Sequence, residues 1–138
     1  MSLIDKLLQM DKAKIMEMPT REVEIPRLSE VLGEPFKVTC KAIDGERYAD
    51  IQRSAIDLNK KGALRNINLY EMQVLTLIEG VVEPSMKDER LLGYFGVVTP
   101  KELVKKLFLA GEIAELSNVI TELSGYEKTE DEEEIKKQ

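Results

Sequence analysis

The densest group of carboxylates in the chain lies close to its C-terminal end. Glu130, Asp131, Glu132, Glu133 and Glu134 follow one another without interruption. Carboxylates act as metal ligands or as acid–base pairs when separate, fixed elements bring them together. This run is contiguous and self-repelling, and no fixed element supports it. We therefore predict a solvated acidic segment rather than a metal site or a catalytic pair.

A thiol is the other side chain that suggests chemistry. Cys40 is the single cysteine, so no internal disulfide is possible, and the cytosol is the natural compartment. The chain contains no histidine, which is the usual base beside a thiol and the commonest metal ligand. Cys40 also falls on the apolar side of an alternating segment. We interpret it as a core thiol, and we predict a protein that is not an enzyme and holds no cofactor or metal.

Neither the glycines nor the basic residues form a recognised ligand motif. Gly93, Gly96 and Gly111 lack the following lysine and the strand–loop–helix order of a phosphate-binding loop, so we predict turns and helix ends. Three roles are open for the basic residues. They bind an acidic partner, they bind the protein's own acidic C-terminal end, or they form a solvated helix face with no partner. They are Arg47, Arg53, Lys60, Lys61 and Arg65, of which Arg47 and Arg53 are candidate partner-binding residues.

Size and charge exclude several classes of protein. The chain has 138 residues with 43% apolar content, which is enough for one core. Its net charge of −6 would repel the phosphates of nucleic acid, so no nucleic-acid partner is expected. The longest apolar runs are shorter than a membrane span, and the charged N-terminal stretch is a poor secretion signal. We predict a cytoplasmic protein with no membrane contact.

The first part of the chain predicts one helix followed by two strands. Residues 2–17 read as an amphipathic helix capped by Ser2. Residues 21–28 alternate between polar and apolar side chains, and Pro26 limits that strand to a sheet edge. Residues 36–43 alternate in the same way. These two strands predict a small antiparallel pair, which needs helices against it to be stable.

Helix signals dominate the rest of the chain. A helix is expected after the Asp-Gly turn at residue 44 and should end near Gly62. Asn68 with Glu71 forms a capping-box pattern before a segment that is apolar almost all round, which predicts a buried central helix. Ser85 with Asp88 predicts the start of a short helix.

Two further helices are predicted at the end of this region. Thr99 followed by Pro100 is a strong start signal for a helix that should end at residue 110, and a last helix is expected over 112–123. The complete prediction is a mostly helical α+β domain over residues 1–126. Its strand pair within residues 21–43 packs on a bundle of about five or six helices within residues 44–126. Residues 127–138 are predicted to be a disordered acidic tail.

Apolar faces are the most prominent feature of the last two predicted helices. Leu103, Val104, Leu107 and Phe108 gather on one side of helix 100–110, whereas Leu109 lies on its flank. Val119 lies beside the apolar stripe of helix 112–123. Most of these side chains should pack inside the domain. We predict that Leu109 and Val119 contribute to a surface that binds a protein partner.

Several short sequence segments of this region resemble those of one protein family. The segments GVVEP (Gly80–Pro84), FGVVTP (Phe95–Pro100), GEI (Gly111–Ile113) and LSGY (Leu123–Tyr126) resemble the XkdN-like tail assembly chaperones of phages and defective prophages. The resemblance covers most of the chain and is densest from Glu79 to Tyr126. It supplies no catalytic residues to carry over.

The resemblance implies a specific role in assembly. Such a chaperone coats the long helical tape measure protein before the tail tube polymerises around it, recruits tail tube subunits and then leaves. The implied partners are therefore the tape measure protein, the tail tube protein and further copies of the chain in a homo-oligomer. The expected place of action is the host bacterial cytoplasm, with the protein absent from the mature virion. The alternative is a structural tail subunit that is retained in the particle.

Overall fold

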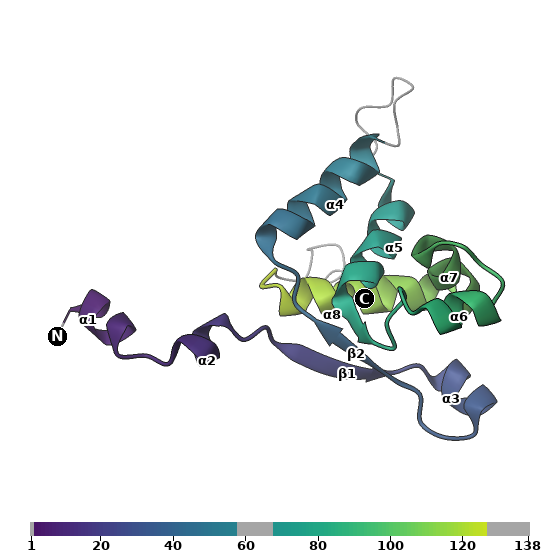
Figure 1. Ribbon diagram of the computed structural model, residues 1–138, viewed down its shortest axis with the longest axis horizontal. Coiled ribbons are helices and arrows are strands. Elements are labelled where there is room, and N and C mark those ends of the chain that lie inside the picture. The colour runs from purple at the N-terminus through teal and green to yellow at the C-terminus, as the bar shows by residue number, and fades with distance from the viewer. Residues whose placement is uncertain (1, 58–67, 127–138) are drawn as a thin grey trace, which may run out of the picture.

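The computed structural model describes residues 2–57 and 68–126, and within them the fold is α+β (Figure 1). The predicted arrangement of one strand pair on about five or six helices is wrong in its details. The sheet has three strands, and the described residues contain eight helices. The predicted tail at 127–138 and the predicted helix end near Gly62 lie outside the described residues.

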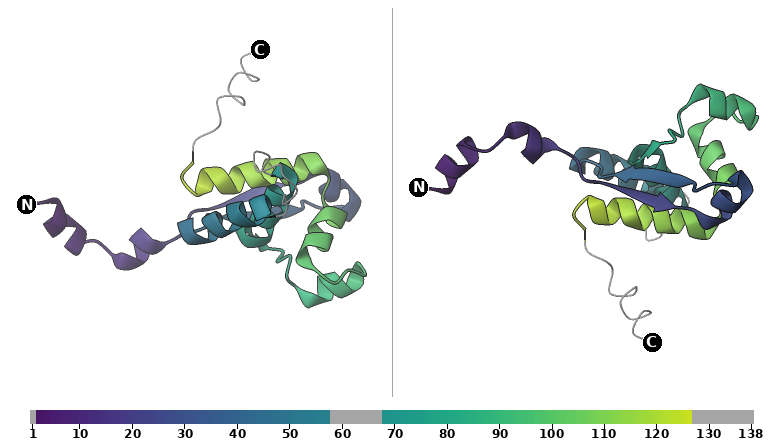
Figure 2. Two further views of the ribbon diagram at one scale, coloured as in Figure 1. Left: turned by 90° about the horizontal axis from the view of Figure 1, so that it is seen from above. Right: turned by 90° about the horizontal axis from the view of Figure 1, so that it is seen from below.

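The predicted helix over 2–17 is divided into two short helices that extend away from the body (Figure 2). Helix α1 spans Leu3–Leu8, and Ser2 caps it by accepting from the backbone N–H of Asp5. Helix α2 spans Lys12–Met16. The Asp11 side chain accepts from the backbone N–H of Ala13 at 2.9 Å, so it starts a new helix instead of continuing the first.

The strand predicted over 21–28 is shorter than expected and continues into a helix. Strand β1 spans Thr20–Glu24, and Pro26 begins helix α3 (Pro26–Leu32). Proline suits a first helical position because the amide hydrogen it lacks would be unpaired there. The backbone N–H of Phe36 donates to Ser29 Oγ at 2.8 Å, which returns the chain from α3 to strand β2 (Lys37–Lys41).

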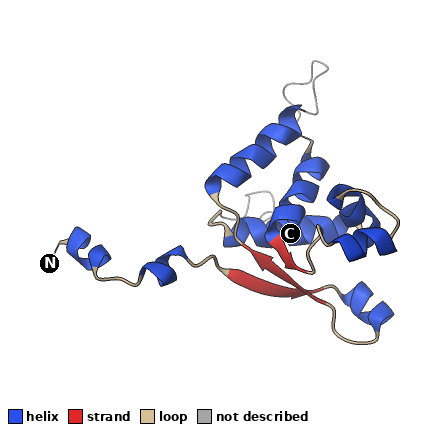
Figure 3. Ribbon diagram, in the orientation of Figure 1, coloured by secondary structure: helices blue, strands red, loops and turns tan. Residues whose placement is uncertain are grey.

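The sheet is antiparallel in the order β1–β2–β3 (Figure 3). In the β1–β2 pair, Val23 lies opposite Val38. Strand β3 (Val81–Glu83) follows a helix directly and pairs with β2 around Thr39 and Cys40. Strand β3 was not predicted from the sequence, because three residues are too few to establish an alternating pattern.

Three helices and the sheet enclose the core. Helix α4 spans Gly45–Asp57, α5 spans Leu69–Gly80 and α8 spans Ala110–Leu123. Asn68 caps α5 as predicted, by accepting from the backbone N–H of Glu71. Helix α8 lies along the sheet, as the two views in Figure 2 show. Buried side chains of β2, α5 and α8 form a single cluster that includes Val38, Cys40, Leu77, Ile113, Leu116 and Ile120.

The remaining two helices differ from the prediction at their ends. Helix α6 (Glu89–Tyr94) is capped by Asp88, whereas Ser85 belongs to the preceding turn. Helix α7 (Pro100–Leu107) starts at the Thr99 cap as predicted but ends three residues early. Phe108 then adopts extended backbone, and its side chain enters the core. Glu112 Oε1 accepts from the backbone N–H of Leu109 at 2.8 Å, which starts α8 at residue 110.

Candidate functional site

The described residues do not bring potential metal ligands together, and their single cysteine is buried. Among them, no group of three or more Cys, Asp or Glu side chains is placed to hold a metal ion. No helix in these ranges is long and apolar enough to cross a membrane. Cys40 is fully buried, and this burial raises the pKa of its thiol to about 11. The thiol is therefore protonated near neutral pH and acts as a core side chain.

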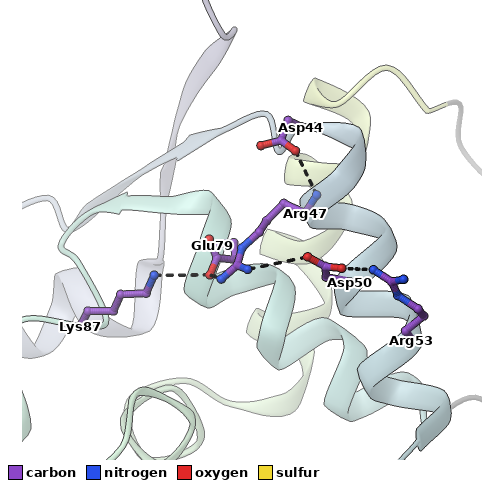
Figure 4. Close-up of polar contacts among 6 residues, drawn as sticks. All are labelled: Asp44, Arg47, Asp50, Arg53, Glu79 and Lys87. Atoms are coloured by element: carbon purple, nitrogen blue, oxygen red, sulfur yellow. Dashed lines mark hydrogen bonds and ion pairs between the residues drawn. The ribbon is translucent and has the colours of Figure 1, made fainter.

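Two residues of the predicted basic cluster, Arg47 and Arg53, are paired with carboxylates of the same chain (Figure 4). The other three, Lys60, Lys61 and Arg65, lie outside the described residues. Arg47 on α4 donates to Glu79 of α5 at 2.7 Å, and Arg53 forms an ion pair with Asp50. Lys87 also contacts Glu79, with Nζ 3.4 Å from the same carboxylate oxygen. The Arg47 hydrogen bond holds the pKa of Glu79 below its usual range. Arg47 thus joins α4 to α5, and a role for Arg47 and Arg53 in partner binding stays a prediction.

A second carboxylate joins two helices from a more buried position. Glu71 of α5 is only 7% exposed, and its side chain contacts Lys101 Nζ at 2.6 Å and Lys105 Nζ at 3.6 Å, both from α7. The hydrogen bond from Lys101 lowers the pKa of Glu71, against the opposing effect of burial. The charged form of Glu71 therefore stabilises the packing of α7 on α5.

Replacing Glu71 with Gln is expected to lower the free energy of unfolding at pH 7 by roughly 1–3 kcal/mol. The folded-state pKa of Glu71 lies below its ordinary value of 4.5. The stabilisation is therefore complete above that value and is lost as the pH falls through the folded-state pKa. Denaturant unfolding at a series of pH values should show the wild type and the variant converging in acid. Glu115→Gln, on the exposed side of α8, is the control and should change little. A constant difference between wild type and Glu71→Gln at every pH would contradict this assignment.

Leu109 lies at an exposed junction between three helices. It precedes the first residue of α8, and its side chain is 58% exposed. Beside it, Arg27 of α3 donates to both oxygens of the Glu112 carboxylate, at 3.1 and 2.8 Å, and to the backbone oxygen of Leu107 at 2.9 Å. The Arg27 contact lowers the pKa of Glu112. This ion pair fixes α3 against the α7–α8 junction.

Helix α3 also carries an exposed apolar side chain on the side that bears Arg27. Val31 lies one helical turn after Arg27, on the same side of α3, and is 79% exposed. We call Leu109 and Val31, with the Arg27–Glu112 pair between their helices, the α3–α8 surface. The sequence suggested Leu109, but it showed no sign of Val31, because residues 26–32 were predicted as strand and turn.

Val119 lies away from this surface. It follows Leu109 by ten positions along α8, which places the two about 15 Å apart along the helix axis. Its side chain is partly buried and packs against the core. The structure therefore does not bring Val119 and Leu109 into one patch, and a partner-binding role for each stays a prediction.

The most extensive exposed apolar segment is the N-terminal arm, residues 2–18. All of these residues are exposed, and neither α1 nor α2 has a buried side chain. Seventeen large apolar side chains are exposed in the described part of the chain, and eight of them belong to the arm. They are Leu3, Ile4, Leu7, Leu8, Met10, Ile15, Met16 and Met18. The sequence predicted the helical content but not its separation from the body, because an amphipathic pattern does not identify the surface that covers it.

The fold is similar to that of a solved structure, the crystal structure of the protein yqbn. The two chains are 21% identical, with a TM-score of 0.59, and the match covers 86% of this chain and 98% of the other. At this identity the similarity concerns the fold alone. A search of curated proteins gives no match.

The sequence matches a family model over residues 4–136. The model is that of the phage XkdN-like tail assembly chaperone protein. Because the match spans nearly the whole chain, it includes residues 4–18 of the N-terminal arm and the α3–α8 surface. The chain belongs to the family of XkdN-like phage tail assembly chaperones.

Proposed function

We propose that this chain binds the tape measure protein before the tail tube forms around it, and that it helps to recruit tail tube subunits without catalysis. Membership of a tail assembly chaperone family supports a role in tail assembly. The single structural observation that carries the finer proposal is the exposure of two apolar side chains, Leu109 and Val31, on the α3–α8 surface. A surface of this kind suits an apolar partner.

On the body of the protein, the α3–α8 surface is the candidate site for this partner. Leu109 and Val31 present apolar side chains around an ion pair that holds their helices in place. A long helix with an apolar stripe can bury that stripe against such a surface. Exposed charge around the site favours a complex that stays in solution, and the chain has a net charge of −6.

The proposed function includes a place and a time of action. The chain acts in the host bacterial cytoplasm on newly made tape measure protein. It leaves as tube subunits replace it, so it is absent from the mature virion. The retained structural subunit is the alternative, and the protein content of finished tails separates the two.

Changing Leu109 and Val31 together to Ser is expected to weaken capture of the tape measure protein by about 1–3 kcal/mol while leaving the fold intact. Both side chains are exposed, so their loss removes little from the core. The measurement is a pull-down of tape measure protein co-expressed with tagged chaperone, together with thermal unfolding of each variant.

A matched control tests whether the position of the substitution matters. Leu69, the first residue of α5, is 63% exposed and lies outside the α3–α8 surface. Leu69→Ser should leave capture unchanged. If it weakens capture as much as the double substitution, the α3–α8 surface is not the site. If wild-type chaperone captures no tape measure protein, the proposed function is wrong.

A further inference from the structure

We propose that a groove between the N-terminal arm and the body binds an amphipathic helix of a partner protein, and that this helix carries carboxylates beside its apolar stripe. The inference goes beyond the proposed function, because it concerns a different surface and a partner defined by its chemistry alone. The groove lies at the C-terminal end of α8, whereas the α3–α8 surface lies at the other end of that helix, about 20 Å away along its axis.

Three segments that are distant in the chain line this groove, which we call the arm–body groove. They are residues 15–19, residues 42–43 directly after β2, and residues 123–125 at the end of α8. The enclosed volume is about 410 Å³. Figure 2 shows the arm leaving the body beside this end of α8. An open groove of this size accepts side chains from one face of a helix.

Hydrogen bonds fix the parts of the groove that belong to the body. The backbone N–H of Ala42 donates to the backbone oxygen of Pro19 at 3.1 Å, which holds the base of the arm beside β2. The backbone N–H of Ile43 donates to Ser124 Oγ at 2.9 Å, and Ser124 Oγ donates to the backbone oxygen of Ile120 at 2.7 Å. The fold therefore forms this part of the groove before any partner binds.

The side chains that the arm contributes are apolar and adaptable. Ile15, Met16 and Met18 line the groove and are exposed. Met10 is exposed further out, so three of the five methionines in the described residues belong to the arm. Methionine is flexible and polarizable, and exposed methionines are typical of surfaces that repack around different apolar partners. The lining therefore favours the apolar stripe of a helix.

Lysines without a partner inside the protein lie beside the groove. Lys12 lies one helical turn before the lining residue Met16, on the same side of α2. Lys14 belongs to the same short helix, and Lys41 directly precedes the lining segment 42–43. All three lysines are exposed, and none has an ion-pair partner among the described residues. By contrast, every arginine in those ranges is held in an ion pair.

These lysines set the charge expected of the partner. Glu17 is the one carboxylate in the lining. The neighbouring carboxylates are already engaged, since Asp44 accepts from the backbone N–H of Arg47 and Glu122 pairs with Arg21. Unpaired positive charge therefore exceeds unpaired negative charge beside the groove, although the whole chain carries −6. Carboxylates on both sides of a bound apolar stripe would complement it.

The first test compares two synthetic helical peptides that carry a leucine stripe over about five turns. The Glu peptide has glutamates on both sides of the stripe, and the Lys peptide has lysines there. Fluorescence anisotropy measures their binding to the full-length protein. At about 0.15 M salt, where distant charges are screened, the Glu peptide should bind at least about tenfold more tightly than the Lys peptide. The net charge of −6 favours the opposite order. Equal binding, tighter binding of the Lys peptide or no binding of the Glu peptide would overturn the proposal.

The second test uses charge reversal to locate the binding site. Lys12→Glu with Lys14→Glu should weaken binding of the Glu peptide at least about tenfold and strengthen binding of the Lys peptide. The matched control is Lys37→Glu with Lys106→Glu, which changes the net charge equally at two exposed lysines outside the groove. It should leave both affinities nearly unchanged. Equal effects of the two pairs would show that binding reflects net charge, and the proposal would be wrong.

A third test addresses the apolar lining. Met16→Asp should weaken binding of the Glu peptide at least about tenfold, because it puts a charge into the apolar contact. Val98→Asp, at an exposed residue outside the groove, is the control and should leave the affinity unchanged. If Met16→Asp instead alters only the sedimentation of the protein alone, a second copy occupies the groove and the proposal fails.

The same assay separates this proposal from the proposed function. Changing Leu109 and Val31 together to Ser should leave binding of the Glu peptide unchanged, because both residues lie outside the groove. Peptide binding that depends on these two residues would place the peptide on the α3–α8 surface and would overturn the inference. Capture of the tape measure protein does not enter this assay, so either proposal can fail while the other stands.

Discussion

Replacement of Leu103 by Ala is expected to lower the free energy of unfolding by about 2–5 kcal/mol. Leu103 lies on α7 and is fully buried in the core. Its truncation removes apolar contacts and leaves a cavity that the surrounding helices fill only in part. Denaturant unfolding of the variant and of wild type gives the difference directly.

Two other leucines of the same segment are the controls for this prediction. Leu107 packs against the core but is partly exposed, so Leu107→Ala should cost less than Leu103→Ala. Leu109 is more than half exposed, and Leu109→Ala should cost least. The expected order of destabilisation is therefore Leu103, then Leu107, then Leu109. Equal costs at the three positions would show that the assignment of the α7 face is wrong.

Replacement of Gly80 by Ala is expected to destabilise the fold by about 1–3 kcal/mol, although Ala is the better helix former. Gly80 is the last residue of α5 and is buried against α8. A Cβ atom at this position would lie 2.6 Å from both Cδ1 and Cγ2 of Ile120. Ile120 is itself fully buried, so moving its side chain to relieve the contact would disturb the packing of the core. Thermal and denaturant unfolding measure the cost.

A Gly→Ala substitution at another position and a double mutant show whether the contact with Ile120 causes the destabilisation. Gly111 lies in the first turn of α8, where an added Cβ would meet nothing within 4 Å, so Gly111→Ala should not destabilise. In an Ile120→Ala background the close contact at Gly80 is gone. Gly80→Ala should then lower the free energy of unfolding much less than it does in the wild-type background. If Gly80→Ala costs the same in both backgrounds, the contact with Ile120 is not the reason.

Local capping signals allowed several helix starts to be predicted from the sequence. Ser2, Asn68 and Thr99 each cap a helix in the structure, because a side-chain oxygen beside a free backbone N–H is a local arrangement. Helix ends were less accurate. Helix α7 ends at Leu107 because Phe108 packs into the core, and Gly111 lies inside α8 rather than between helices. That outcome depends on tertiary packing, which no local pattern records.

The candidate surface was predicted only in part, because it too depends on tertiary packing. Leu109 was identified because it lies off the apolar face of its segment, and it is exposed in the structure. The α3–α8 surface also requires Arg27 and Glu112, which are 85 positions apart in the chain and meet through the fold. The arm is a different case. Its apolar residues were visible in the sequence, but that none of them is buried in the core is a property of the whole structure.

The protein content of finished tails distinguishes a chaperone that leaves the assembly from a subunit that stays in it. Quantitative mass spectrometry is applied to the lysate of phage-producing cells and to tails purified from it. The chaperone should be present in the lysate and absent from the tails, while the tape measure and tail tube proteins should be present in both. A constant ratio of this chain to the tape measure protein in purified tails would identify the chain as a structural subunit and overturn the proposed chaperone role.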